Sequence, residues 1–246
     1  MEKLVYKRIF QEDALKLSDI KDYCLFVDTQ SESGSINFTL YNPSNIVSRL
    51  KKSEPIVDVF KDSILAMVQI GKEGKIKVPQ MAWKINFIAA KPESKAGVLM
   101  YDIAMSYVSK KGQGLTPDRQ SVSQNAQKVW RYYFTKRNDI KKIPIDNYKE
   151  PVTKNKKDDG GLYTLKNLAK DDVDKGYDNR SFINYIYIMT KPLNYFGMVK
   201  NHNDFLKELY TNFKNIELSE FIVQLRNASA EFFNEIYEKN AIVNVK

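Results

Sequence analysis

The chain of 246 residues contains a single cysteine, Cys24, and a single histidine, His202. One cysteine cannot form an internal disulfide bond, and its neighbours Tyr23, Leu25 and Phe26 favour a buried thiol. One cysteine and one histidine are also too few to supply the ligands of a structural zinc site. This scarcity excludes an internally disulfide-bonded scaffold and a zinc finger, and it favours an intracellular protein.

Long apolar segments are also missing. No apolar run approaches the roughly 20 residues that a helix needs to cross a lipid bilayer. The charged residues Glu2 and Lys3 stand where a secretory signal would begin, and no apolar signal segment follows them. We therefore expect no membrane insertion and a cytoplasmic location, which for a viral protein means the host cytoplasm or the virion.

Acidic residues are fewer than basic ones, with 30 Asp and Glu against 39 Lys and Arg, so that the formal net charge is +9. A positive protein attracts anions, and we predict an anionic partner: coenzyme A, nucleic acid or an acidic protein. Residues 136–157 hold eight basic and three acidic residues. The candidate nucleic-acid contacts in this segment are Lys141, Lys142, Lys154, Lys156 and Lys157. The alternative is a charged segment that is simply solvated.

The composition, 43% hydrophobic and 28% charged, is typical of a folded globular protein. Alternating or continuous apolar runs of strand length predict four strands, with Ala82–Ala90 as the clearest. The other three are Ile36–Tyr41, Ser63–Ile70 and Phe182–Met189. Weaker strand-like pieces are predicted at Lys3–Phe10 and Lys75–Val78, and the rest of residues 1–61 is predicted to be irregular or to form short strand-like pieces.

Helical periodicity begins directly after Ala82–Ala90. Apolar residues from Ala96 to Tyr107 fall on one helical face, and Gly112 and Gly114 end that helix. Only a brief strand fits around Leu115 before Pro117. The sequence thus predicts a strand, a helix and a short strand in succession.

A second helix is predicted to open at Ser121, with Gln124 completing a capping box. Its apolar stripe includes Trp130 and Tyr133. Two further helices are predicted at the C-terminal end, over residues 203–213 and 219–240. We therefore expect one domain over residues 1–200, a polar basic insertion at 136–180 and a helical C-terminal extension over 201–246.

The stretch Ser94–Phe134, preceded by the strand Ala82–Ala90, resembles the acyl-CoA-binding core of the GNAT acyltransferases. That core has a strand, a turn containing glycine, a helix, a short strand and a helix with a small polar residue and an alanine near its start, here Ser123 and Ala126. The resemblance implies an α/β fold with a mixed, mostly antiparallel sheet flanked by helices.

The resemblance also implies a binding site for acetyl-CoA or another acyl-CoA. The strand edge would pair with the pantetheine arm, and the start of the following helix would hold the pyrophosphate, since unpaired amides and the helix dipole attract phosphate. The implied contacts are Ile88, Ala89, Ala90, Ser94, Lys95, Ala96, Gly97, Val98 and Ser123.

GNAT enzymes often keep a tyrosine acid one turn after the alanine, and this chain has Trp130 there. Tyr133 is then the candidate catalytic acid. The leading hypothesis is acyl transfer from an acyl-CoA to an amine. The alternatives are a catalytically inactive GNAT-like protein acting as a structural or binding component, and a basic nucleic-acid-binding accessory protein.

The same stretch also resembles a group of phage-encoded proteins of unknown role. The shared residues are Asp118, Arg119, Ser123, Ala126 and Trp130. This second resemblance implies a viral, structural or virion-associated setting.

Overall fold

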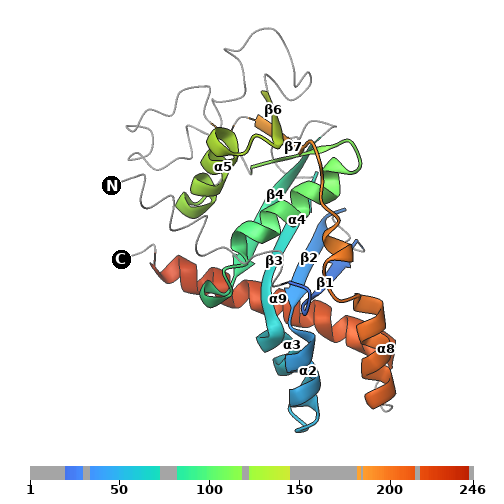
Figure 1. The fold of residues 1–246 in the computed structure, drawn as a ribbon. Coiled ribbons are helices and arrows are strands. Elements are labelled where there is room, and N and C mark those ends of the chain that lie inside the picture. Colours follow the sequence, from blue (N-terminus) through green and yellow to red (C-terminus); the bar gives the residue numbers. More distant parts are fainter. Residues whose placement is uncertain are drawn as a thin grey trace.

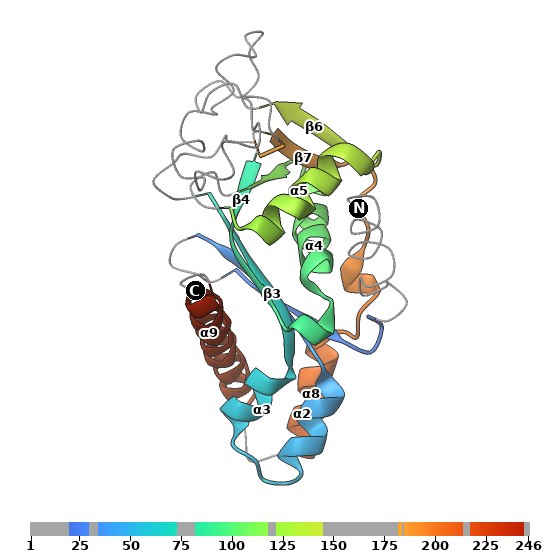
Figure 2. The same cartoon turned by 90° about the vertical axis from the view of Figure 1, so that its left-hand side faces the viewer.

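The computed structural model describes residues 20–29, 34–72, 82–117, 122–144, 182–183, 185–213 and 217–243. The described strands form one seven-stranded sheet with helices on both faces (Figures 1 and 2). The expectation of an α/β protein with a mostly antiparallel sheet is therefore confirmed. The predicted strand-like pieces at residues 3–10 and 75–78 lie outside the described residues.

The sheet has the order β1-β2-β3-β4-β5-β7-β6. Neighbouring strands are antiparallel, except that β4 and β5 run parallel. The strands are β1 (Cys24–Asp28), β2 (Ile36–Tyr41), β3 (Ile64–Gly71), β4 (Ala82–Ala90), β5 (Gly114–Thr116), β6 (Ile140–Pro144) and β7 (Tyr185–Met189).

The described helices include those expected after β4 and at the C-terminal end. They are α2 (Pro43–Leu50), α3 (Ile56–Ser63), α4 (Gly97–Ser109), α5 (Gln124–Lys136), α8 (His202–Asn212) and α9 (Leu218–Val243), with 3₁₀ turns η3 (Pro92–Ser94) and η5 (Tyr195–Gly197). None of the described helices combines the length and apolar composition needed to cross a membrane.

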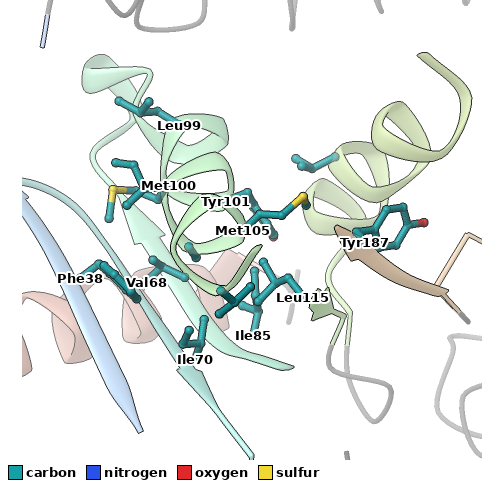
Figure 3. Close-up of a cluster of buried hydrophobic side chains, with 14 of the residues drawn as sticks. Phe38, Val68, Ile70, Ile85, Leu99, Met100, Tyr101, Met105, Leu115 and Tyr187 are labelled. Atoms are coloured by element: carbon teal, nitrogen blue, oxygen red, sulfur yellow. The ribbon is translucent and has the colours of Figure 1, made fainter. Parts of the chain in front are cut away.

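Helix α4 covers one face of the sheet. Its residues Leu99, Met100 and Met105 are buried against Val68 and Ile85 of β3 and β4, as Figure 3 shows. Every second side chain of the strands points to this face. Most residues of α4 are buried, so the helix presents a wide apolar surface to the sheet. This layer forms the larger of the two main cores.

Helix α9 covers the opposite face (Figure 2). Phe87 of β4 stacks on Phe233 with ring centroids 3.9 Å apart, and Arg226 donates two hydrogen bonds of 2.9 Å to Asp28 of β1. The second core therefore lies between α9 and the sheet. Its further members include buried side chains of α3 and α8, such as Phe60 and Phe205.

The first 61 residues contain two helices that the sequence prediction missed, α2 and α3. Asn42 caps α2 by accepting hydrogen bonds from the amides of Ser44 and Asn45, and Pro43 takes the first helical position. The Asn-Pro-Ser sequence was the available signal. Ser63 ends α3 rather than beginning the following strand, because its hydroxyl donates to the carbonyl of Val59.

Helix α5 begins later than predicted. Its N-cap is Ser123, whose Oγ accepts a hydrogen bond from the amide of Ala126 at 3.3 Å. Ser121, the predicted start, lies outside the described residues. The capping box is replaced by a single serine cap because Ala126, at the position that would reciprocate, has no polar side chain.

The beginning of the predicted basic insertion belongs to the sheet. Residues Ile140–Pro144 form β6 and pair with β7 along its length, so this part of the predicted insertion is a strand of the sheet. Strand β7 is also shorter than predicted, since Phe182 and Ile183 lie in a turn. Periodicity missed β6 because its two central residues are both lysine.

Gly114 is needed where β5 passes β7. A Cβ atom at this position would lie 2.2 Å from Cγ2 of Ile186, whereas one at Gly97 would meet Ala90 Cβ at 3.8 Å, an ordinary contact. We expect Gly114→Ala to lower the free energy of unfolding by about 1–3 kcal/mol through overpacking. Gly97→Ala is the matched control and should be neutral or slightly stabilising. Urea denaturation of both variants checks this, and equal stability of the two would contradict it.

Candidate functional site

Strand β4 parts from β5 after the first third of its length. The two strands pair only from Ala82 to Lys84, where Lys84 lies opposite Thr116, while β4 remains paired with β3 as far as Ala90. Residues 85–90 therefore have no partner strand on the β5 side within the described part of the chain. The backbone amides and carbonyls of a strand edge can pair with an extended ligand.

A β-bulge lies at the point of divergence. Gln69 of β3 pairs with Phe87 and Ile70 pairs with Ile85, so Asn86 is the extra residue of β4. Its Nδ2 donates to Gln69 Oε1 at 3.0 Å, which anchors the bulge to β3. A bulge bends its strand and strengthens the local twist. Asn86 is not marked by any sequence pattern, because a bulge leaves no signal in an apolar pattern.

Two polar atoms beside the divergence lack a hydrogen bond. Asn86 Oδ1 and Thr116 Oγ1 are buried, and neither has a partner in the described structure. Thr116 is the last residue of β5 and is 2% exposed. Buried polar atoms are normally hydrogen-bonded, so Thr116 Oγ1 marks the end of the β4–β5 ladder as a place where a further polar group would fit.

The start of α4 lies against the end of β4. Ala96 is the N-cap and supplies no side-chain hydrogen bond to the first amides of the helix. Ser94 Oγ is occupied, since it donates to Lys91 O at 2.7 Å and accepts from the Ala96 amide at 3.3 Å. Lys95 is exposed with φ of 53°. The first turn of α4 thus carries amides without a side-chain cap beside an exposed lysine.

The predicted cofactor contacts divide into three sets. The strand residues and the turn residues come together, because Gly97 lies beside Ala90. Within the strand, Ile88 and Ala90 face the α4 core, whereas Ala89 is buried in the α9 core. Ser123 lies apart in sequence as the N-cap of α5, where its Oγ accepts from the Ala126 amide.

Tyr133, the predicted acid, is buried. Its hydroxyl donates a 2.6 Å hydrogen bond to Asp102 of α4, and Asp102 also accepts from Arg137 at 3.1 and 3.2 Å. Burial raises the pKa of Tyr133 well above its usual value, and the charge of Asp102 adds to this effect. Burial also raises the pKa of Asp102, although Arg137 and Tyr133 favour its charged form. The phenol therefore joins α4 to α5.

Trp130 is likewise a core residue, with 1% of its surface exposed. Its ring meets those of Tyr101 and Tyr133 edge to face, with centroids 5.4 and 5.9 Å away, and lies 4.9 Å from the ring of Tyr187. Aromatic pairs of this geometry add to the stabilisation from buried area. Trp130 holds α5 against α4 and β7.

The predicted nucleic-acid contacts are only partly described. Lys141 and Lys142 lie on β6, the last strand of the described sheet, while Lys154, Lys156 and Lys157 lie outside the described residues. Lys142 donates to the carbonyl of Arg137 at 2.7 Å. Lysines on an outer strand hinder pairing with another chain, and the nucleic-acid role of these two residues stays a prediction.

No protein-family model matches the chain, and neither a curated protein nor a solved structure matches it. Among the described residues, no group of three or more His, Cys, Asp and Glu side chains is placed to hold a metal ion. The function must therefore be argued from the geometry of β4, β5 and α4.

Removing the Tyr133 hydroxyl tests whether its hydrogen bond to Asp102 stabilises the contact between α4 and α5. Tyr133→Phe should lower the free energy of unfolding by about 1–3 kcal/mol, because it takes a donor from a carboxylate whose side chain is only 18% exposed. Tyr107→Phe is the control, since the Tyr107 hydroxyl accepts a solvent-exposed hydrogen bond from Lys111. This change should lower the free energy of unfolding by less than about 0.5 kcal/mol. Chemical denaturation measures both values. A Tyr133→Phe protein as stable as the wild type would show that this hydrogen bond does not stabilise the fold.

Truncating Trp130 should destabilise the protein more than removing the Tyr133 hydroxyl. Trp130→Ala should lower the free energy of unfolding by roughly 3–5 kcal/mol, because it leaves a cavity among three tyrosine rings. Thermal and urea denaturation check the value. A cost below about 1 kcal/mol would mean that the indole does not support the α4–α5 core.

Proposed function

We propose that the protein is a GNAT-like acyltransferase that binds an acyl-CoA along the β4 edge and transfers the acyl group to an amine. The observation that carries the proposal is the parting of β4 from β5 after Lys84 and Thr116, beside the start of α4. It supports the free strand edge that the resemblance to the family implies for the pantetheine arm. The order strand, helix, short strand, helix over β4 to α5 supports it as well.

The fit of an acyl-CoA rests on two features. Its extended pantetheine arm carries amide groups, which can pair with the backbone of residues 86–90 as a partner strand would. Its pyrophosphate would meet the first amides of α4, where the helix dipole is positive and Lys95 adds a charge. Thr116 Oγ1, buried without a hydrogen bond, offers a further polar contact where the strands part.

The chemistry would depend on position rather than on a dedicated acid. Backbone amides of the bulge at Asn86 would polarise the thioester carbonyl, and the amine nitrogen would attack its carbon. The bond between carbon and sulfur breaks as the amide forms, the sulfur leaves as thiolate, and the amine proton passes to it or to water. Tyr133 takes no part in this scheme, because its proton is held by Asp102.

A second candidate is a GNAT-like protein that binds acyl-CoA or another ligand without catalysis. The burial of both Trp130 and Tyr133 favours it, since neither side chain can donate a proton to a ligand on β4 while it remains in the core. The helical C-terminal extension and the division at residue 200 remain predictions under either candidate.

Acetyl-CoA binding tests the site. Gly97→Asp places a carboxylate in the first turn of α4, where it suits the helix dipole and should leave stability intact, but it repels phosphate. We expect isothermal titration to show acetyl-CoA binding that Gly97→Asp weakens about 5-fold or more. Gln113→Glu is the control: it adds the same charge beyond the other end of α4 and keeps the acceptor for Trp83 Nε1.

Release of the coenzyme A thiol from acetyl-CoA, measured with polyamines and lysine peptides as acceptors, distinguishes the acyltransferase from the inactive binding protein. Release that depends on the amine supports transfer, whereas binding without release supports the inactive protein. No heat and no change in melting temperature at millimolar acetyl-CoA would overturn the acyl-CoA site.

A further inference from the structure

The histidine lies where α8 meets the sheet. His202 is the first residue of α8, and its Nδ1 is 2.7 Å from the hydroxyl of Tyr41 on β2. Its ring centroid is 4.9 Å from that of Phe26 on β1. Tyr41 is fully buried, so its hydroxyl depends on protein partners.

Tyr41 also interacts with Cys24 through its hydroxyl. The Tyr41 hydroxyl has one proton and two neighbouring acceptors, the Cys24 sulfur and His202 Nδ1, and we assign the proton to the 2.7 Å contact with Nδ1. This assignment is favoured because an imidazole nitrogen accepts more strongly than sulfur. His202 then serves as an acceptor, which requires the neutral ring.

The surroundings of His202 disfavour a charged ring. It stands at the positive end of the α8 dipole, and the neighbouring cation Lys200 forms an ion pair with Glu208 at 2.6 Å. Lys200 is also fixed to the outer strand of the sheet, because its amide donates to the carbonyl of Tyr23 at 2.8 Å. The titratable and charged groups around this contact are Tyr41 from β2, which meets His202 directly, Cys24 from β1, which interacts with Tyr41, and the Lys200–Glu208 ion pair of the α8 segment.

We propose that His202 is an acid-sensitive latch that holds α8 against β1 and β2. Protonation places an N–H on both ring nitrogens, so Tyr41 loses its acceptor and a cation is left in the α8–sheet contact. The remaining attachment is apolar, through Phe205, Leu206 and Leu209. Acid therefore releases α8 while the centre of the sheet stays folded.

The direction of the pH dependence follows from the docked state. Burial lowers the pKa of His202 from 6.5 to about 4. The undocked ring regains its ordinary pKa, so undocking takes up a proton between these two values. The contribution of neutral His202 to the docking of α8 is fully present above pH 6.5 and is lost as the pH falls toward 4. At pH 5 the docking equilibrium should be about 30-fold less favourable than at pH 7.5.

Hydrogen exchange of the full chain tests the latch. After correction for intrinsic rates, amides of α8 should lose about 30-fold in protection between pH 7.5 and pH 5, while amides of β3 keep theirs. His202→Asn is the matched control, because the Asn oxygen can accept from Tyr41 near the Nδ1 position and cannot become charged. It should abolish the pH-dependent loss.

Equal loss of α8 protection in wild type and His202→Asn would overturn the latch, since other groups would then cause it. The ring signals of the single histidine in isotope-labelled wild type provide a test without any variant. A ring that titrates at or above its ordinary pKa, or one that carries its proton on Nδ1 at neutral pH, would also overturn it.

Discussion

Strands β3 and β4 must be covered on both faces, and the other elements are arranged around this requirement. The run from Ile64 to Ile70 is almost entirely apolar, so neither of its faces can remain in water. Helix α4 supplies one apolar layer and α9 the other. A strand that is buried on both faces can bind a ligand only along its edge, where its backbone groups are exposed.

The candidate site follows from that limit. The bulge at Asn86 bends β4, and the short β5 pairs with only its first third, so an edge of a central strand is left without a strand partner in the described part of the chain. The chain then turns through η3 into α4, which brings a helix start to the same edge. An exposed edge and a positive helix end thus result from one connection.

Buried polar groups hold the helices around this edge in fixed positions. Asp102, Tyr133 and Arg137 join α4 to α5, and Tyr41 with His202 joins the sheet to α8. Each group is stable only while its partners remain in place, because an unpaired buried polar atom is costly. The first of these networks explains why a tyrosine at a predicted catalytic position serves the packing of α4 against α5. The second makes the position of α8 depend on pH.

The sequence by itself determined the succession of strand, helix, short strand and helix from β4 to α5, because apolar periodicity and glycine are local signals. It also placed β2, most of β3 and the two C-terminal helices. It missed α2 and α3, which depend on a cap and a proline, and β6, which carries two lysines on an outer strand. Only the tertiary structure decided the bulge at Asn86, the parting of β4 from β5 and the hydrogen bond from Tyr133 to Asp102. Each of these depends on neighbours far away in sequence: Gln69 for Asn86, Thr116 for Lys84, and Asp102 for Tyr133. Patterns within one segment report which face is apolar, and they do not report which segment will cover that face.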